Sequence, residues 1–343
     1  MRVRVRFARA CAIRSEAVPC YHPLKLYRAK AGRNKETGRW PLVSNPRDGL
    51  IDQVVEVPCG RCIGCRLERS RQWAVRCMHE LKSHDQSAFL TLTYKDPPLG
   101  GSLVLKDLQD FFKRLRKAIH PVKVRYMACG EYGEQLGRPH YHVILFGYDF
   151  PDKVPFKKTG SGCQTYISLQ LEHLWGHGMT NIGDVTFESC AYVARYVTKK
   201  VNGDAAEDHY SVVDPETGEI FHRKPEFIVM SRKPGIGSNW VEKYQDDVIA
   251  HQGRVLSNGH LATMPRYYEK QLVRTRENDV LTIKARRVNV SRETKLAKPL
   301  EFGPDRMAVK EECQQLRFKK LPRPFEVMQQ FGSYVELKKD LKK

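Results

Sequence analysis

The hydrophobic and polar positions are most regular between residues 87 and 245, where strand-like and helix-like segments alternate. Short runs rich in threonine, aromatic and β-branched residues are typical of strands, and they predict strands at 88–94, 122–129, 140–146, 179–185 and 227–230. Apolar residues at helical spacing predict helices over 105–119, 166–175 and 186–200. Thr186 and Glu188 suit the N-cap and the first turn of the last of these helices.

This order of segments predicts an α+β fold with an antiparallel sheet and flanking helices. Residues 130–139 contain three glycines and join two of the strands as a loop or hairpin. We expect three parts: a basic arm and cysteine-cluster segment with a helix (1–86), the α+β domain (87–245) and a basic C-terminal extension (246–343). The last part, after residue 270, forms either a flexible DNA-holding tail or a surface helix.

The helix expected in the first part has a stripe of small and apolar residues at helical spacing. The stripe consists of Leu67, Ser70, Ala74, Cys77, Met78 and Leu81. Four arginines crowd the other faces of this helix: Arg66, Arg69, Arg71 and Arg76. They fit either a solvated surface or a surface that contacts phosphate.

The charge of the chain favours a polyanionic partner. Its 343 residues include 59 lysines and arginines against 39 aspartates and glutamates, a formal net charge of +20. Such a field attracts nucleic acid first and an anionic membrane second. The longest apolar runs are only a few residues, far short of the roughly 20 that span a bilayer. The N-terminus is basic but lacks the apolar stretch of a secretory signal. We therefore expect nucleic acid as the partner and no membrane.

Three of the ten cysteines lie close together with C-x2-C-x2-C spacing: Cys59, Cys62 and Cys65. In a reducing compartment, clustered thiols indicate a metal rather than disulfides. A tetrahedral site needs a fourth ligand, for which Cys20 is the first candidate and His22 the second. We expect a structural Zn²⁺, because nothing in the chain calls for electron transfer, and an iron–sulfur cluster is the alternative.

The segment RPHYHVILFG places two histidines, His140 and His142, on the same face of one predicted strand. Two imidazoles about 6–7 Å apart along a strand can hold one cation between them. Glu131 ends the preceding strand, and a hairpin would bring it beside them as a third ligand. The alternative is a pair of ordinary surface or core histidines.

The segment AYVARYVTKK carries two tyrosines, Tyr192 and Tyr196, one helical turn apart on one face. Arg195 lies between them, and Lys199 and Lys200 follow. The tyrosines fit either an active-site helix or the roof of a hydrophobic core. In the second case the lysines would simply complement the helix dipole at its C-terminus.

Three motifs in this order resemble those of the HUH rolling-circle replication initiators. They are FLTLTY, GEYGEQLGRPHYHVILFG and FESCAYVARYVTKK. More narrowly, the chain resembles the replication initiation proteins of the gokushovirus group of microviruses, which are small single-stranded DNA phages. The segments VPCGRCIGCRLERSRQWAVRCMHE, EFIVMSRKPGIG and MPRYYEK add to this resemblance, which covers roughly residues 18–270.

The resemblance implies an HUH endonuclease domain that nicks single-stranded DNA, or supercoiled replicative-form DNA, at the origin. Tyr192 and Tyr196 would be the nucleophiles that form a 5′-phosphotyrosine bond, leaving a 3′-OH primer. Glu131, His140 and His142 would hold Mg²⁺ or Mn²⁺, and Lys199 would contact the phosphate or position a tyrosine. Rejoining the unit-length strand would complete the round.

Several partners and contacts accompany this expectation. The basic residues expected to contact DNA are Arg138, Arg195, Lys200, Arg232 and Lys233. No P-loop is evident, so we expect a host helicase to unwind the DNA and a host polymerase to copy it, in the host cytoplasm.

Two other functions suit parts of the same pattern. One is a non-catalytic, zinc-stapled nucleic-acid-binding protein, in which the charge and the cysteine cluster carry the function. The other is a metal phosphodiesterase that uses water, which would cut DNA without becoming attached to it.

Overall fold

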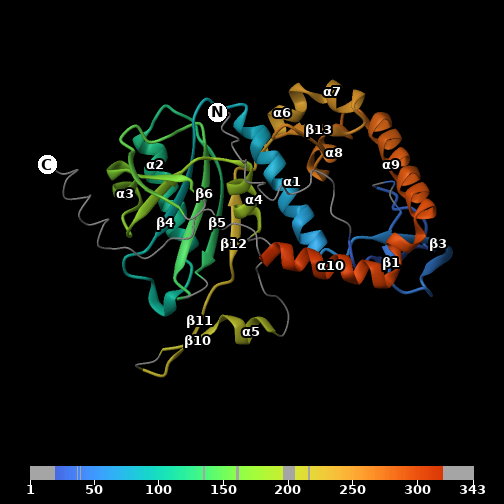
Figure 1. Ribbon diagram of the computed structural model, residues 1–343, viewed down its shortest axis with the longest axis horizontal. Coiled ribbons are helices and arrows are strands. Elements are labelled where there is room, and N and C mark those ends of the chain that lie inside the picture. Colours follow the sequence, from blue (N-terminus) through green and yellow to red (C-terminus); the bar gives the residue numbers. More distant parts are fainter. Residues whose placement is uncertain are drawn as a thin grey trace, which may run out of the picture.

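The computed structural model describes residues 20–36, 38, 40–133, 136–159, 162–195, 205–214 and 217–319 (Figure 1). Its strands are β1 (Leu24–Ala29), β2 (Leu42–Val43), β3 (Gly49–Val57), β4 (Ser87–Thr93), β5 (Arg125–Tyr132), β6 (Pro139–Phe146), β7 (Val154–Lys158), β8 (Gln164–Ile167), β9 (Thr180–Gly183), β10 (Ser211–Val213), β11 (Ile220–His222), β12 (Phe227–Met230), β13 (Arg254–Ser257) and β14 (His260–Thr263). Its helices are α1 (Ile63–Leu81), α2 (Leu105–Ala118), α3 (Leu169–Trp175), α4 (Phe187–Arg195), α5 (Ala205–Tyr210), α6 (Ser238–Lys243), α7 (Gln245–Ala250), α8 (Arg266–Leu272), α9 (Glu277–Ala297) and α10 (Pro304–Lys319).

A seven-stranded sheet with the order β12-β5-β6-β4-β9-β8-β7 forms the centre of the molecule. Its paired strands run antiparallel, which confirms the expected α+β fold with an antiparallel sheet. β5 and β6 form a hairpin whose register places Glu131 opposite His140 and Cys129 opposite His142. The glycine-containing connection of the sequence prediction is therefore a hairpin turn, and it brings the expected ligands together.

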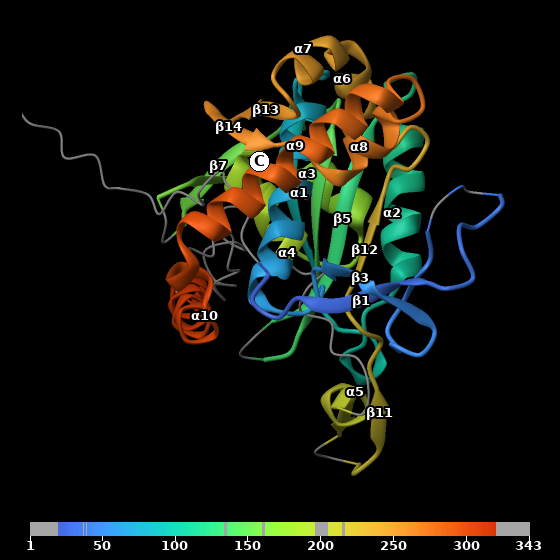
Figure 2. The same ribbon diagram turned by 90° about the vertical axis from the view of Figure 1, so that its right-hand side faces the viewer.

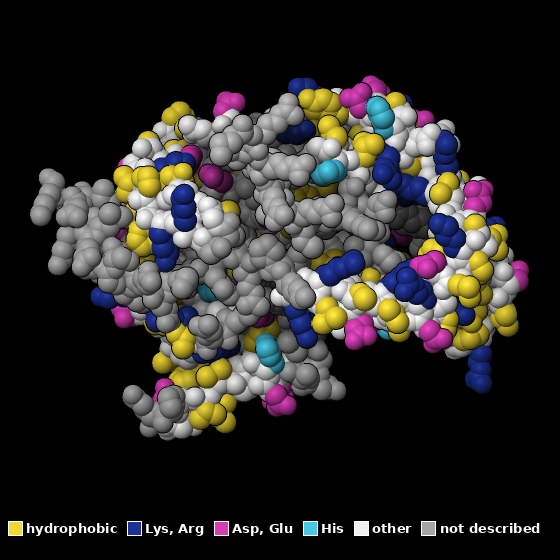
Figure 3. Space-filling view, in the orientation of Figure 1, with side chains coloured by type: hydrophobic (Ala, Val, Ile, Leu, Met, Phe, Trp, Pro, Cys, Tyr) yellow, Lys and Arg dark blue, Asp and Glu magenta, His cyan; other side chains and the backbone are white. Residues whose placement is uncertain are grey.

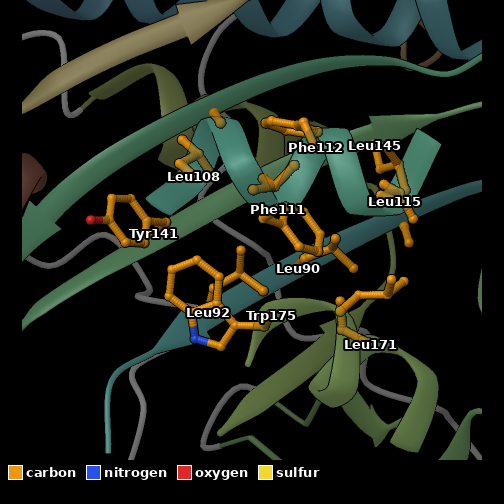
Figure 4. Packing of buried hydrophobic residues seen from close by; sticks show 14 of the residues in the cluster. Leu90, Leu92, Leu108, Phe111, Phe112, Leu115, Tyr141, Leu145, Leu171 and Trp175 are labelled. Atoms are coloured by element: carbon orange, nitrogen blue, oxygen red, sulfur yellow. The ribbon is translucent and has the colours of Figure 1, made fainter. Parts of the chain in front are cut away.

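Helices cover both faces of the sheet, and β4 shows how the sequence divides between them. Ala88, Leu90 and Leu92 point into a core with α2 and α3, whereas Phe89 belongs to the core beneath α1 and α4. Figure 4 shows the α2 and α3 side of this packing, where Trp175 lies beside Leu92. On β6, Tyr141 and Val143 face α2 and α3 in the same way. The even-numbered His140 and His142 therefore face α1 and α4.

α1 packs on more sides than its sequence suggested. One side contacts α4 and the sheet, while Val75 and His79 contact residues from α6, β13 and α8. Two of the four arginines expected at a solvated surface are consequently buried: Arg71 is 3% exposed and Arg76 is 8% exposed. The Arg76 guanidinium lies 3.9 Å from the ring centroids of both Trp73 and Tyr267, so its role in this structure is packing.

Other elements differ from the sequence prediction in places with local causes. The single helix expected over 166–175 is a strand, β8, followed by α3. Ser168 separates the two because its hydroxyl accepts a hydrogen bond from the Leu171 amide and begins the helix there. The helix expected over 186–200 is described as far as Arg195. After residue 270 the chain forms the helices α9 and α10, which agrees with the surface-helix alternative for the described residues.

The packing of α1 joins parts of the chain that the sequence separated. One buried cluster unites α1 with the sheet and α4, and another unites it with residues between Trp240 and Ile283. The boundaries at 86 and 245 therefore stay predictions. Among the described residues, none of the helices combines the length and apolar character that a membrane crossing requires.

Candidate active site and cysteine cluster

The β5–β6 hairpin gathers a carboxylate and two imidazoles at one point. The Nε2 atom of His140 lies 2.5 Å from Oε1 of Glu131, and that of His142 lies 3.1 Å from the same oxygen. One ligand atom from each of the three residues lies within 4.8 Å of the others. The alternation of side chains along β6 and the hairpin register account for this group, as the sequence predicted.

Burial and charge fit this group to a cation. Glu131 is 3% exposed and His142 is fully buried. Burial by itself would raise the pKa of Glu131, but the charge of His140 and hydrogen bonds from both histidines outweigh it and lower the pKa to about 2. The Oε2 atom of Glu131 is buried and has no hydrogen-bond partner in the described part of the chain. A buried, ionised carboxylate with an unused oxygen suits a metal ligand.

The second nitrogen of each imidazole is also held. Nδ1 of His140 donates to the carbonyl of Arg138 at 3.1 Å, and Nδ1 of His142 contacts the hydroxyl of Thr91 at 3.1 Å. These contacts direct both Nε2 atoms towards Glu131, which is how metal-binding histidines are usually oriented. From the sequence, FLTLTY is expected only to be a core strand that supports the histidines. Thr91 was missed, although the alternation of threonine and leucine in FLTLTY places it on the polar face.

Thr91→Val should weaken metal binding by the Glu131, His140 and His142 group by about 10-fold to 100-fold, because the His142 ring loses the contact that orients it. Titration with Mn²⁺ followed by calorimetry measures the affinity. Thr93→Val is the matched control, since its hydroxyl donates instead to the Met179 carbonyl on the same strand pair. Equal affinities for both variants would show that Thr91 does not position His142.

Helix α4 brings Tyr192 to the same group. Thr186 caps this helix as predicted, because its hydroxyl accepts a hydrogen bond from the Ser189 amide at 3.2 Å. The Tyr192 hydroxyl lies 3.4 Å from Glu131 Oε1, and its ring meets the His142 ring edge-on at 5.1 Å between centroids. Tyr192 therefore faces the histidines, but it is only 5% exposed. A substrate reaches it only after the groups that cover it are displaced.

Contacts from two sides fix α4. From α1, the Ser70 hydroxyl donates to the carbonyl of Ala191, the residue before Tyr192, at 2.8 Å. The guanidinium carbon of Arg195 lies 5.4 Å from the centroid of the Tyr192 ring. Ser70 was identified in the sequence only as part of an apolar stripe, and nothing in that pattern indicated its hydrogen bond to α4.

The structure places the other expected site residues apart from this group or leaves them undescribed. Tyr196, Lys199 and Lys200 lie outside the described residues. Nη2 of Arg138 donates to the carbonyls of Tyr94 and Lys95, each at 2.9 Å, and so ties the β5–β6 turn to the end of β4. The remaining two, Arg232 and Lys233, are exposed in the segment that follows β12.

The cysteine cluster forms a second group with metal-binding geometry. The sulfur atoms of Cys20, Cys59, Cys62 and Cys65 all lie within 4.8 Å of one another. The Cys59–Cys65 and Cys20–Cys62 sulfur distances are 4.0 and 3.9 Å, close to the roughly 3.8 Å edge of a tetrahedron with Zn–S bonds of about 2.3 Å. His22 instead contacts Glu311 of α10 at 2.6 Å, so Cys20 is the fourth member.

Backbone amides prepare this cluster for anionic sulfur. The amides of Arg61 and Cys62 donate to the Cys59 sulfur at 3.5 and 3.3 Å. Burial raises the pKa of Cys59, but hydrogen bonds from these amides and from neighbouring thiols lower it to about 6. The cluster also links the start of α1 to β1, since Cys62 is the N-cap of that helix.

Cys65→Ser should lower the zinc content of the purified protein from about one ion per chain to near zero, because a tetrahedral site loses one of its four thiolates. The unfolding midpoint should fall by about 5 °C or more, since metal binding contributes directly to folding. Elemental analysis and calorimetry measure both. Cys163→Ser, at an exposed thiol away from the cluster, is the control. Unchanged zinc content in Cys65→Ser would contradict the assignment.

Comparisons with known proteins agree with these motifs. A family model described as replication-associated protein ORF2 matches residues 87–201. The chain is 36% identical over 221 residues to the replication-associated protein VP4 of Bdellovibrio phage phiMH2K, which covers 62% of this chain and 66% of that protein. It is 28% identical over 298 residues to the replication-associated protein ORF2 of Spiroplasma virus 4, covering 80% and 87%. It is 34% identical over 152 residues to the replication-associated protein ORF4 of Chlamydia phage 1, covering 42% and 38%. No solved structure matched the chain.

Proposed function

The chain belongs to the replication-associated proteins of microvirus-like phages, and we propose that it starts rolling-circle replication by nicking one DNA strand at the origin through a tyrosine. The observation that carries the proposal is the contact between the Tyr192 hydroxyl and Glu131, because Glu131 also contacts both histidines. A nucleophile and a metal-binding group thus meet at one carboxylate, which suits phosphodiester cleavage better than DNA binding alone.

The proposed reaction exchanges one phosphodiester for another. The phenolic oxygen of a tyrosine attacks the scissile phosphorus, the bond to the 3′ oxygen breaks, and a free 3′-OH is left as a primer. The 5′ phosphate stays bonded to the tyrosine, so the energy of the broken bond is kept for rejoining. Tyrosine has an ordinary pKa near 10 and is a weak nucleophile at neutral pH. A cation near the phenol, such as Arg195, favours its anionic form.

The residues suit a divalent cation at this site. Glu131, His140 and His142 would hold it, and when bound it would polarise the scissile phosphate and stabilise charge on the leaving oxygen. Two imidazoles favour Mn²⁺, although a mixed histidine and carboxylate set also accepts Mg²⁺ when phosphate oxygens complete the coordination. We assign Zn²⁺ to the four cysteines, with a structural role.

The remaining roles follow from the same reaction. Tyr196 is the second nucleophile, and Lys199 contacts the phosphate or positions a tyrosine. Arg138, Arg195, Lys200, Arg232 and Lys233 contribute to DNA binding. Unwinding and synthesis come from a host helicase and polymerase in the host cytoplasm.

Two tyrosines allow one protein copy to complete a full round. One holds the 5′ end while the other cuts the regenerated origin, and the freed 3′-OH then attacks the first linkage to release a circle. Tyr192→Phe or Tyr196→Phe alone should therefore retain measurable nicking but lose most of the circular product. Gel analysis of a substrate with two origin copies separates these products. Normal circle formation by both single variants would contradict the alternation.

A further inference from the structure

Positive charge does not by itself locate a second DNA contact on this protein. Lysine and arginine side chains are distributed over both halves of the face in Figure 3 rather than gathered in one patch. A position where cations and a partly exposed aromatic ring occur together is more informative, because proteins hold single strands by combining both.

The connection between β1 and β3 has this combination. It stands away from the body of the molecule in Figure 2. From Arg28 to Arg47 the sequence has six lysines and arginines and one acidic residue. Within it, the guanidinium carbons of Arg28 and Arg33 lie 5.6 and 5.7 Å from the centroid of the Trp40 ring. Both arginines are exposed and Trp40 is half-buried.

The backbone presents this group in a defined position. The Trp40 indole nitrogen donates to the carbonyl of Ala29 at 2.9 Å, which fixes the ring against the end of β1. The Lys30 ammonium donates to the Arg47 carbonyl at 2.9 Å and ties the two ends of the connection together. The indole is thus anchored at its polar edge, while two guanidinium groups stand beside its π-surface.

The connection is also joined to the helix beneath the nucleophile. β1 and β3 pair with each other, and the cysteine cluster fastens both to the start of α1. Further along α1, Ser70 contacts the residue before Tyr192. Arg61 and Arg69 are exposed between these two points. A DNA strand that leaves the candidate active site along α1 would meet exposed cations and then Trp40.

We propose that the segment from Arg28 to Arg47, which we call the β1–β3 arm, is a second binding site for single-stranded DNA. In this site an unpaired base stacks on Trp40 while Arg28 and Arg33 contact the flanking phosphates. The inference rests on the proposed action on single-stranded DNA. It adds a contact outside the catalytic motifs, and it requires an unpaired base, because the bases of a duplex are already stacked on one another.

The test measures DNA binding by the full chain in a Tyr192→Phe/Tyr196→Phe background, which removes both proposed nucleophiles. Fluorescence anisotropy with a labelled single-stranded oligonucleotide of mixed sequence, about 20 nucleotides long, gives the affinity and its salt dependence. Adding Trp40→Leu should weaken binding about tenfold, whereas Trp40→Phe should restore most of it because phenylalanine still stacks. Arg28→Ala/Arg33→Ala should weaken binding and lower the slope of log affinity against log salt by about 1.4.

The control removes the same charge from the opposite layer of the fold. Lys113→Ala/Lys117→Ala alters two exposed lysines on α2 and should leave the affinity within about twofold. Arm variants that bind as tightly as this control would overturn the proposal. An equal loss of affinity for duplex DNA in Trp40→Leu would overturn it as well. If the unmodified chain forms no covalent adduct with DNA while these binding results hold, the proposed nicking fails and the arm stands.

Discussion

Replacing Tyr192 and Tyr196 together with phenylalanine should abolish covalent attachment of the protein to DNA. The change removes two hydroxyl groups and leaves both rings in place, so the packing of Tyr192 against His142 is retained. Without a phenolic oxygen no phosphotyrosine bond can form, and the rate of adduct formation should fall by about 10³-fold or more. Denaturing gel electrophoresis with a 5′-labelled or 3′-labelled origin oligonucleotide shows whether a protein–DNA band remains.

The matched control for this double variant is Tyr148→Phe. Its hydroxyl contacts Gln170, on the α2 and α3 side of the sheet, and takes no part in the metal-binding group. This variant should form adducts at the rate of the unmodified protein. If adducts persist when both Tyr192 and Tyr196 are replaced, another residue is the nucleophile.

Glu131→Gln should be nearly as severe. The substitution keeps the size of the side chain but removes the negative charge at the point where both imidazoles converge. A buried cation would then lack its anionic ligand, so metal affinity should fall by about 100-fold and nicking by about 10²-fold to 10⁴-fold. Nicking rates measured against Mn²⁺ concentration separate the loss of metal binding from a loss of folding.

Glu188→Gln is the control for this charge change, because Glu188 is exposed in the first turn of α4 close to the same site. It should retain the metal dependence of the unmodified protein. Nicking by Glu131→Gln at the normal rate and normal Mn²⁺ concentration would show that the carboxylate is not a ligand in the reaction.

The parts of the site that the sequence predicted depend on short-range geometry. Alternation along one strand places His140 and His142 on one face, and a turn between neighbouring strands brings Glu131 opposite His140. Helical spacing and the Thr186 cap predicted α4, and the spacing of three cysteines predicted the cluster that Cys20 completes. Each of these relations extends over a few residues or one hairpin.

The parts that it did not predict depend on contacts between distant segments. Arg76 is buried because Tyr267 packs against it, and Tyr267 comes from a helix almost 200 residues later. Ser70 reaches the carbonyl before Tyr192 only because α1 and α4 share one layer. Thr91 meets His142 because β4 pairs with β6 rather than with another strand. No local pattern determines which segments become neighbours in this way.

The most direct test of the account is to identify the amino acid that becomes bonded to DNA. The unmodified protein is incubated with an origin oligonucleotide and Mn²⁺, digested with protease and nuclease, and analysed by mass spectrometry. We expect a nucleotide joined through its 5′ phosphate to Tyr192 or Tyr196. Cleaved DNA with no linked peptide, or a link at any other residue, would contradict the account.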